Sequence, residues 1–218
     1  SENPVAVHME SNRILLLFVH PAFQNSRANR QLLEAVRDLE GLTVHDLYEE
    51  YPDFAIDVPR EQRLLKEHDL IVFQHPFYWY SCPALLKEWL DLVLEYGFAY
   101  GPGGEALKEK MLLSAVTTGG GPEAYRQDGH NRFTIRQLLA PFEQTAALCG
   151  MRYLPPFVTH GMRQRPGDEL IRVRAAAYRQ ALTCLRDNAF DLEALTGADY
   201  LDSVLIHPHA HQKEGDHA

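Results

Sequence analysis

The chain has 218 residues, and 45% of them are hydrophobic, which is enough to bury one sizeable core. Its 21 basic and 30 acidic residues give a formal net charge of -9, the wrong sign for holding a polyphosphate backbone, so no nucleic acid is expected as a partner. The longest apolar run, 14–19, is far too short to cross a bilayer, and the chain does not open with a signal-peptide pattern. We therefore expect one soluble, cytoplasmic domain.

The chain contains three cysteines, Cys82, Cys149 and Cys184. They are an odd number and have no CxxC or Cys/His metal spacing, which suits a reducing compartment. Each is expected to be a small buried hydrophobe, and we expect no metal site.

Apolar runs and amphipathic stretches alternate along the sequence. The run 14–19 predicts a strand buried on both faces, and apolar residues then recur at helical spacing over 28–39. Further strands are predicted at 42–47, 70–73, 111–116 and 151–154 with Phe157, and further helices at 59–67, 83–94, 134–148 and 170–185.

Five strands separated by helices predict an α/β fold with a parallel sheet and helices on both faces, because right-handed crossovers leave few other arrangements. We expect a doubly wound, flavodoxin-like, five-stranded sheet of order 2-1-3-4-5 at 13–190, between an N-terminal extension (1–12) and a C-terminal extension (191–218). Ligands of such sheets bind at the carboxyl ends of the strands, where the strand order reverses. The site is therefore expected in the loops after Val19, Gln74 and Val116.

The last stretch of the chain, 197–218, has little apolar content after Ile206 and is expected to be a mobile or partner-bound tail. Ordering so polar a segment costs about 1–2 kcal/mol per residue, which argues against a metal site there. The histidines that could otherwise act as ligands are His207, His209, His211 and His217.

The first loop, 20–29, lies between a buried strand and a helix. Free backbone N–H groups, the helix dipole, the Ser26 hydroxyl and Arg27 together make an anion site that would suit a phosphate. The alternative is a plain helix N-terminus capped by Ser26, without a ligand. Neither GxGxxG nor GxxxxGKS occurs, which disfavours a Rossmann dinucleotide fold and a P-loop ATPase.

The second and third loops have compositions that suit a flat ligand. The second, 75–83, presents consecutive aromatic residues between two prolines, which can form a wall for a tricyclic ring. Aromatic core packing is the alternative, although consecutive aromatic residues cannot all face one core. The third, 117–122, has three glycines at a strand end, where a ligand can approach the backbone closely, and its alternative is a flexible turn.

These loops carry motifs at a specific spacing: HPFYWYSCPALLKEWLD at 75–91, EYGFAYG at 95–101, and TTGGG at 117–121 followed by Tyr125 and His130. With them the sequence resembles the NAD(P)H:quinone oxidoreductases, and most closely the ancillary quinone oxidoreductases of glutathione-regulated potassium efflux systems. The resemblance extends from about Arg13 to Asn188.

The resemblance implies that the three loops hold a flavin by its phosphate and ribityl chain, by the faces of its ring system and by its pyrimidine side, in that order. The residues so implied are His20, Ser26, Arg27, Ala28 and Asn29, then Pro76, Phe77, Tyr78, Trp79 and Tyr80, then Thr117, Thr118, Gly119 and Gly120.

The resemblance also implies two catalytic residues, Tyr125 and His130, which would face the nicotinamide or the quinone and accommodate charge. Tyr125 fits the family spacing directly. The interval from Tyr125 to His130 is one residue shorter than in the larger animal quinone reductases, so the family role of His130 is carried over less directly than that of Tyr125.

The function implied by the resemblance is two-electron, ping-pong hydride transfer from NAD(P)H through FMN to quinones, in a homodimer with active sites between subunits. FAD is the alternative cofactor, and FMN is favoured because we expect this chain to lack the longer C-terminal extension with which the larger animal quinone reductases help hold FAD. The alternative function is a regulatory subunit of a glutathione-gated potassium efflux transporter, with a structural or sensing flavin, peripheral to the inner membrane. One-electron carrying is a weaker alternative, because the aromatic loop and the pair Tyr125 and His130 suggest a second substrate on the flavin face.

Overall fold

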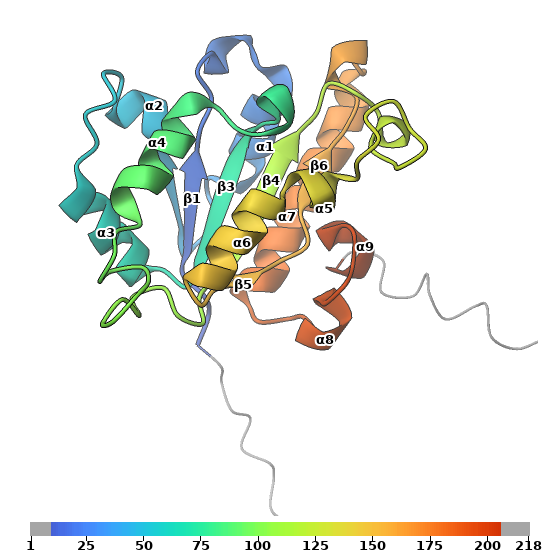
Figure 1. Ribbon diagram of the computed structural model, residues 1–218. Helices are drawn as coiled ribbons and strands as arrows, with labels where there is room; N and C mark the ends of the chain where they lie inside the picture. The colour runs from blue at the N-terminus through green and yellow to red at the C-terminus, as the bar shows by residue number, and fades with distance from the viewer. Residues whose placement is uncertain (1–9, 206–218) are drawn as a thin grey trace, which may run out of the picture.

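The apolar runs of the sequence form one parallel sheet within residues 10–205, the part of the chain that the computed structural model describes (Figure 1). The strand order is β2-β1-β3-β4-β5, so the predicted flavodoxin-like order 2-1-3-4-5 is confirmed. The strands are β1 (Ile14–Phe18), β2 (Leu42–Asp46), β3 (Leu70–Pro76), β4 (Met111–Thr117), β5 (Arg152–Tyr153) and β6 (Phe157–Thr159).

The fifth position of the sheet holds two short strands, where the sequence predicted one. Both β5 and β6 pair with β4, but a step of four residues along β4, from Met111 to Ala115, corresponds to a step of five along its partner, from Arg152 to Phe157. The interruption falls at Pro155 and Pro156, because a proline has no N–H to donate to the ladder. The chain thus bulges here and resumes pairing beside the last residues of β4.

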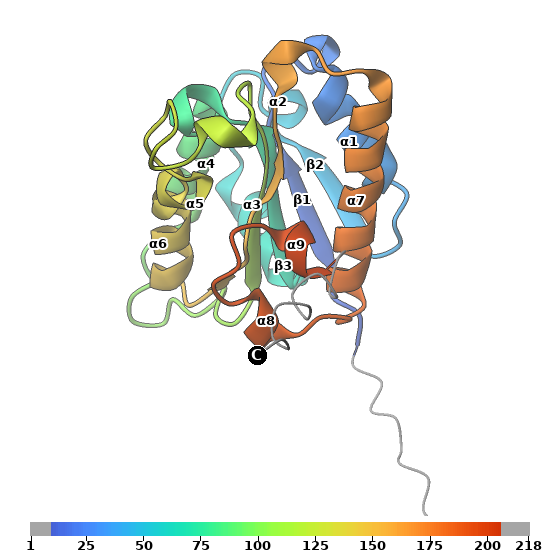
Figure 2. The ribbon, with the colours of Figure 1, turned by 90° about the vertical axis from the view of Figure 1, so that its right-hand side faces the viewer.

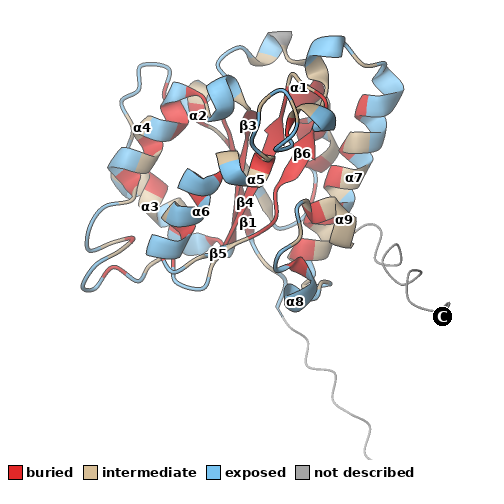
Figure 3. Ribbon diagram, turned by 45° about the vertical axis from the view of Figure 1, so that its right-hand side comes forward, coloured by how far each residue is buried: buried red, intermediate tan, exposed pale blue. Residues whose placement is uncertain are grey.

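Two layers of helices cover the sheet (Figure 2). The chain runs from β1 to β2 in one direction and from β2 past β1 to β3 in the other, so right-handed crossovers place α1 on one face and α3 and α4 on the opposite face. The strands β1, β3 and β4 are buried along their whole length (Figure 3). The helices are α1 (Arg27–Val36) and α7 (Asp168–Arg186) on one face, and α3 (Val58–Glu67), α4 (Ala84–Val93) and α6 (Ala140–Leu148) on the other, with the short α2 (Leu47–Glu50), α5 (Ile135–Leu138), α8 (Leu192–Leu195) and α9 (Leu201–Leu205).

The single helix predicted over 134–148 is two helices, α5 and α6, which meet at Leu139. Thr134 and Gln137 form a capping box at the start of α5. Pro141 lies in the first turn of α6, where its missing N–H is tolerated, whereas the interior of one long helix would require that N–H as a donor. The proline therefore divides the predicted helix.

The chain beyond 191 packs against the domain as far as residue 205. Leu195 and Leu201 are buried in the same apolar cluster as α7, and the Leu201 N–H donates to the Pro156 carbonyl oxygen at 3.0 Å. The expectation of a mobile or partner-bound tail from residue 197 is therefore wrong up to residue 205. The four tail histidines lie outside the described residues. Among the helices of 10–205, none combines the length and the apolar character that crossing a bilayer demands.

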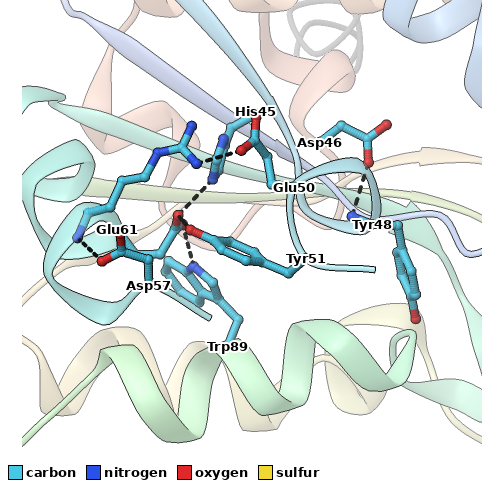
Figure 4. Close-up of polar contacts among 9 residues, drawn as sticks. His45, Asp46, Tyr48, Glu50, Tyr51, Asp57, Glu61 and Trp89 are labelled. Carbon is cyan, nitrogen blue, oxygen red and sulfur yellow. Dashed lines mark hydrogen bonds and ion pairs between the residues drawn. The ribbon is translucent and has the colours of Figure 1, made fainter. Parts of the chain in front are cut away.

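A buried carboxylate ties β2, α2, α3 and α4 together (Figure 4). Glu61 of α3 is fully buried, and its Oε1 accepts hydrogen bonds from His45 Nε2 at 2.8 Å and from the Tyr51 hydroxyl at 2.5 Å. Its Oε2 accepts from Trp89 Nε1 at 2.8 Å. Burial alone would raise the pKa of Glu61, but the hydrogen bonds from His45, Tyr51 and Trp89 outweigh it and lower the pKa below its ordinary value.

Replacing this carboxylate should destabilise the fold. In Glu61→Gln an amide NH₂ would face one of the three donors, so we expect the free energy of unfolding in urea to fall by about 2–3 kcal/mol at pH 7. The matched control is Glu50→Gln, which removes an exposed ion pair with Arg60 and should cost less than about 1 kcal/mol.

The same pair of variants has a pH signature. The pKa of Glu61 in the folded protein lies below its ordinary value of 4.5. Its contribution to the free energy of unfolding is therefore fully present above pH 4.5 and is lost as the pH falls through the pKa of the folded state. The stability difference between the unaltered protein and Glu61→Gln should shrink on acidification. An equal loss for Glu50→Gln and Glu61→Gln would contradict this account.

Candidate functional site

A cleft of about 1010 Å³ lies at the carboxyl ends of β1, β3 and β4, at the expected edge of the sheet. Every residue that the sequence assigned to the site lines it, so the three loops do converge in space. These residues are His20, Ser26, Arg27, Ala28, Asn29, Pro76, Phe77, Tyr78, Trp79, Tyr80, Thr117, Thr118, Gly119, Gly120, Tyr125 and His130.

The start of α1 forms one end of the cleft. Ser26 is the N-cap, and its hydroxyl oxygen accepts from the Asn29 backbone N–H at 3.3 Å and from Asn29 Nδ2 at 3.1 Å. The first turn of α1 carries no acidic side chain, and the first N–H groups of a helix have no partner within it. This end of the cleft therefore favours an anion.

In the described part of the chain, the side chain of Asn29 has one hydrogen-bonded polar atom, Nδ2, and one without a partner, Oδ1. Its Nδ2 also donates to Thr117 Oγ1 at 3.0 Å, which joins the first loop to the third. Within residues 10–205, Asn29 Oδ1 is a buried acceptor with no hydrogen-bond donor. A buried polar atom without a partner is costly, so a donor from a bound molecule would stabilise it.

His20 and Arg27 have defined polar partners in the first loop. The Ala22 N–H donates to His20 Nδ1 at 3.0 Å, so this nitrogen carries no proton, and burial lowers the pKa of His20, which leaves the proton on Nε2. His20 is thus a neutral donor at the cleft wall. The Arg27 guanidinium donates to the Pro166 carbonyl and pairs with Asp168 at 3.2 Å. It therefore joins the first loop to residues 166–168 and is partly neutralised by a carboxylate.

The aromatic loop holds its side chains out of the core. Trp79 is 89% exposed, and Tyr78 and Tyr80 are also exposed, so the alternative of aromatic core packing is wrong for these three residues. Trp79 (φ 49°) and Tyr80 (φ 63°) both have a left-handed backbone, which is costly for a residue with a side chain. The Tyr80 hydroxyl donates to Asn131 Oδ1 at 3.2 Å, which joins the second loop to the segment that follows the third.

The glycine loop is held by the chain that follows β6, so the alternative of a flexible turn does not describe it. Its backbone donates one hydrogen bond to residues 159–163 and accepts three from them. The hydrogen bonds run from the N–H of Thr118 to Thr159 O (2.9 Å), of Met162 to Thr118 O (2.9 Å), of Arg163 to Gly119 O (3.1 Å) and of Gly161 to Gly120 O (2.9 Å).

This fourth loop was missed by the sequence reasoning, which considered only the loops after the first, third and fourth strands. The carboxyl end of the fifth strand opens onto the same edge of the sheet, and Gly161, with φ +81°, marks a turn there that the sequence does offer as a signal. The cleft residues missed are Ala124, Asn131, Met162, Arg163, Arg165, Pro166 and Ile171.

Tyr125 and His130 occupy different settings in the cleft. Tyr125 is almost fully buried, with its ring 6.2 Å from that of Phe77 and 5.5 Å from that of His160. Burial raises the pKa of Tyr125, against a smaller opposing effect of the Thr118 side chain, so its hydroxyl stays protonated at neutral pH and can donate. His130 is exposed at the rim.

A buried polar ladder fixes the start of α1 to the sheet. The Tyr178 hydroxyl of α7 donates to Gln74 Oε1 at 3.0 Å, and Gln74 Nε2 donates to the Asn29 carbonyl at 3.3 Å. Tyr178 and Gln74 are both fully buried. The residue that carries the unpartnered Oδ1 is therefore held by its backbone as well as by its side chain.

Residues 12–182 match the family described as having a flavodoxin-like fold. The chain belongs to the flavodoxin-like family. A curated relative in this family is the ancillary protein KefG of the glutathione-regulated potassium-efflux system of Enterobacter sp. (strain 638), which is 51% identical over 174 residues, 79% of this chain and 94% of the relative.

Two solved structures of flavodoxin-like proteins are also similar. General stress protein 14 of Treponema denticola, solved in complex with FMN, is 40% identical with a TM-score of 0.74 and covers 79% of this chain and 99% of its own. An NADPH-quinone reductase from P. pentosaceus is 33% identical with a TM-score of 0.71 and covers 77% of this chain and 96% of its own. The resemblance inferred from the sequence motifs is confirmed.

The left-handed backbone of the aromatic loop in this flavodoxin-like cleft is testable through stability. Because glycine adopts a left-handed conformation without a Cβ clash, we expect Trp79→Gly to be more stable than Trp79→Ala by about 1 kcal/mol in urea unfolding. The control is the same pair of substitutions at Tyr78, where φ is not positive and alanine should be the more stable. Equal stabilities of the two Trp79 variants would show that the loop relaxes without strain.

Proposed function

We propose that this chain binds FMN and acts as an NAD(P)H:quinone oxidoreductase. The observation that carries the proposal is the single cleft in which an anion-favouring helix start, an exposed aromatic loop and a glycine loop meet. The helix start suits a phosphate, the aromatic loop suits a flat ring system, and the glycine loop lets a ring edge approach the backbone closely. The similarity to a protein solved with FMN and to an NADPH-quinone reductase supports the same proposal.

The residues present fit a flavin mononucleotide. Among the described residues the buried Asn29 Oδ1 has no donor, and a ribityl hydroxyl would supply one. Ser26 and the first N–H groups of α1 would hold the phosphate, and Tyr78, Trp79 and Tyr80 would border the ring system. Gly119 and Gly120 have no side chain to exclude a ring edge from the backbone. FMN is the proposed cofactor, and FAD is the alternative.

A bound flavin would supply the hydride chemistry between NAD(P)H and a quinone. The residues of the chain supply binding, orientation and a proton. His20 Nε2–H is a neutral donor at the wall of the cleft, and the protonated Tyr125 hydroxyl can donate to an acceptor oxygen that gains negative charge. His130 at the rim would be a second proton source, in contact with solvent.

The second candidate function is that of an ancillary subunit of a potassium efflux transporter, favoured by the 51% identity to a protein of that name. The two functions are compatible, since a subunit can also carry an enzymatic site. We propose a cytoplasmic homodimer with active sites between subunits, held at the inner membrane by the transporter. Co-purification with an inner-membrane transporter would support this role, and its absence from membranes that contain the transporter would argue against it.

The FMN proposal is tested by binding. Reconstitution with FMN and desalting should leave a yellow protein with a raised melting temperature, because a ligand that binds the native state stabilises it. Asn29→Ala should weaken FMN binding about tenfold or more, because it removes both the free acceptor and the contacts to Ser26 and Thr117. Asn188→Ala, a matched change outside the cleft, should not. If FMN and FAD both wash off and neither changes the melting temperature, the proposal fails.

Tyr125 is expected to act on chemistry more than on folding. Tyr125→Phe should retain FMN and the melting temperature while it slows flavin or quinone reduction on the order of tenfold in stopped-flow assays, since water in a partly wet site replaces a lost donor at a modest cost. Tyr48→Phe, which lies outside the cleft, is the control. Unchanged rates in both half-reactions would remove Tyr125 from the catalytic residues, and loss of FMN would assign it to cofactor binding.

A further inference from the structure

His160 lies between the glycine loop and the C-terminal segment of the described chain. It follows β6 directly, and its ring packs against Tyr125 at 5.5 Å and edge-on against Tyr200 at 5.8 Å. Its Nδ1 is 3.0 Å from Thr118 Oγ1, and its Nε2 is 3.3 Å from the Tyr200 hydroxyl. One side chain thus touches the glycine loop, the proposed catalytic tyrosine and a segment 40 residues further along the chain.

The hydrogen bonds around His160 are all satisfied by the tautomer that carries its proton on Nδ1. In this arrangement the Thr118 hydroxyl donates to the Gly120 carbonyl at 2.8 Å, and Thr118 Oγ1 accepts from His160 Nδ1–H at 3.0 Å. In a neutral ring Nε2 is then an acceptor, and the Tyr200 hydroxyl donates to it. The chain of donors therefore runs from Tyr200 through His160 and Thr118 to the backbone of Gly120.

Burial, together with a nearby cation, keeps the His160 ring neutral. Burial and the nearby Arg174 guanidinium lower the pKa of His160 to about 4, although the Gly120 carbonyl, Glu123 and Asp202 act in the opposite direction. Arg174 is itself held by Asp202 at 2.6 Å and by the Val158 carbonyl at 2.9 Å. Near neutral pH the His160 ring therefore carries one proton, and each of its nitrogens has a hydrogen-bond partner.

The segment that carries Tyr200 is anchored on both sides. Arg136 of α5 donates to the Ala198 carbonyl at 2.7 Å, and the Leu201 N–H donates to the Pro156 carbonyl at 3.0 Å. Arg174 of α7 pairs with Asp202. The Tyr200 hydroxyl is therefore presented to His160 by a held backbone.

We propose that His160 is a positioning residue of the cleft, through which Tyr200 of the C-terminal segment fixes the geometry of Thr118, Gly120 and Tyr125. The catalytic consequence rests on the proposed function, because it acts through Tyr125. The mechanical coupling between Tyr200 and the glycine loop does not depend on that function.

Three variants dissect the chain of hydrogen bonds. Tyr200→Phe removes only the hydroxyl that donates to Nε2. His160→Asn places an amide N–H near the position of Nδ1, so it keeps a donor to Thr118 and loses the acceptor for Tyr200. His160→Phe loses both. The matched control is Tyr153→Phe. It removes a tyrosine hydroxyl that lies outside the cleft and is hydrogen-bonded to Ser114 Oγ at 2.8 Å.

The first measurement is hydrogen exchange by mass spectrometry, with peptides that cover 117–125, on the protein without added ligand. Exchange in these peptides should be about threefold faster in Tyr200→Phe and His160→Asn, as expected for loss of one neutral hydrogen bond, and about tenfold faster in His160→Phe, while Tyr153→Phe should leave it unchanged. Unchanged exchange in Tyr200→Phe, or a rise spread evenly over the whole chain, would overturn the coupling. If His160→Phe does not fold, the other two variants decide.

The second measurement uses the FMN-loaded protein with NADPH and menadione. The kcat of Tyr200→Phe and His160→Asn should fall about threefold and that of His160→Phe about tenfold, with little change in the KM for menadione, because His160 and Tyr200 are not among the residues that line the cleft. A higher kcat in His160→Asn than in His160→Phe would show that the donor to Thr118 positions the cleft. Equal kcat in all variants would overturn the catalytic part. If the unaltered protein binds no flavin, the proposed function fails, and the exchange data still decide the coupling.

Discussion

β1 pairs in parallel with β2 on one side and with β3 on the other, and the placement of every loop in the cleft follows from this arrangement. The chain must leave β1 for one face of the sheet and return from β2 by the opposite face. Helices therefore cover both faces, and the loops after β1 and β3 diverge at the carboxyl edge. This edge is where a ligand finds free backbone groups without any strand being distorted.

The loops of the cleft are not independent of one another. Asn29 joins the first to the third, Tyr80 joins the second to the segment that follows the third, and Thr118 joins the third to the chain after β6. The conformation of each loop is therefore stabilised by a hydrogen bond to a segment that is distant in sequence. Such cross-links favour a cleft that is formed before a ligand arrives, which lowers the entropy lost on binding.

The sequence predicted the fold well because the central strands are buried on both faces. Strands in that setting are continuous apolar runs, and Pro, Gly and Ser mark the loops that follow them. The cleft residues were predicted from a motif resemblance rather than from spacing, and the geometry brings all of them together. The break between α5 and α6 could also have been predicted, because Pro141 is poorly tolerated inside a helix. The apolar pattern over 134–148 nevertheless predicted one continuous helix.

Other features had no local signal. The fourth loop lies after a strand split by Pro155 and Pro156, so its place at the cleft depends on how β6 resumes pairing with β4. The contact of His160 with Tyr200 joins residues 40 positions apart, and nothing in either neighbourhood indicates it. Packing of the C-terminal segment likewise depends on Leu201 reaching a cluster built by α7, which no periodicity in so short a segment reveals.

The buried Glu61 carboxylate also bears on how this molecule assembles. Its three donors come from β2, from the residue that ends α2 and from α4, and none of them is on α3 itself. A partly assembled state in which α3 docks before α4 would place an ion in an apolar surrounding with one donor missing. Intermediates of that kind are high in energy, so α2, α3 and α4 should join the sheet in one cooperative step. This side of the molecule is then expected to fold and unfold as a unit, with few half-docked states open to proteases or to self-association.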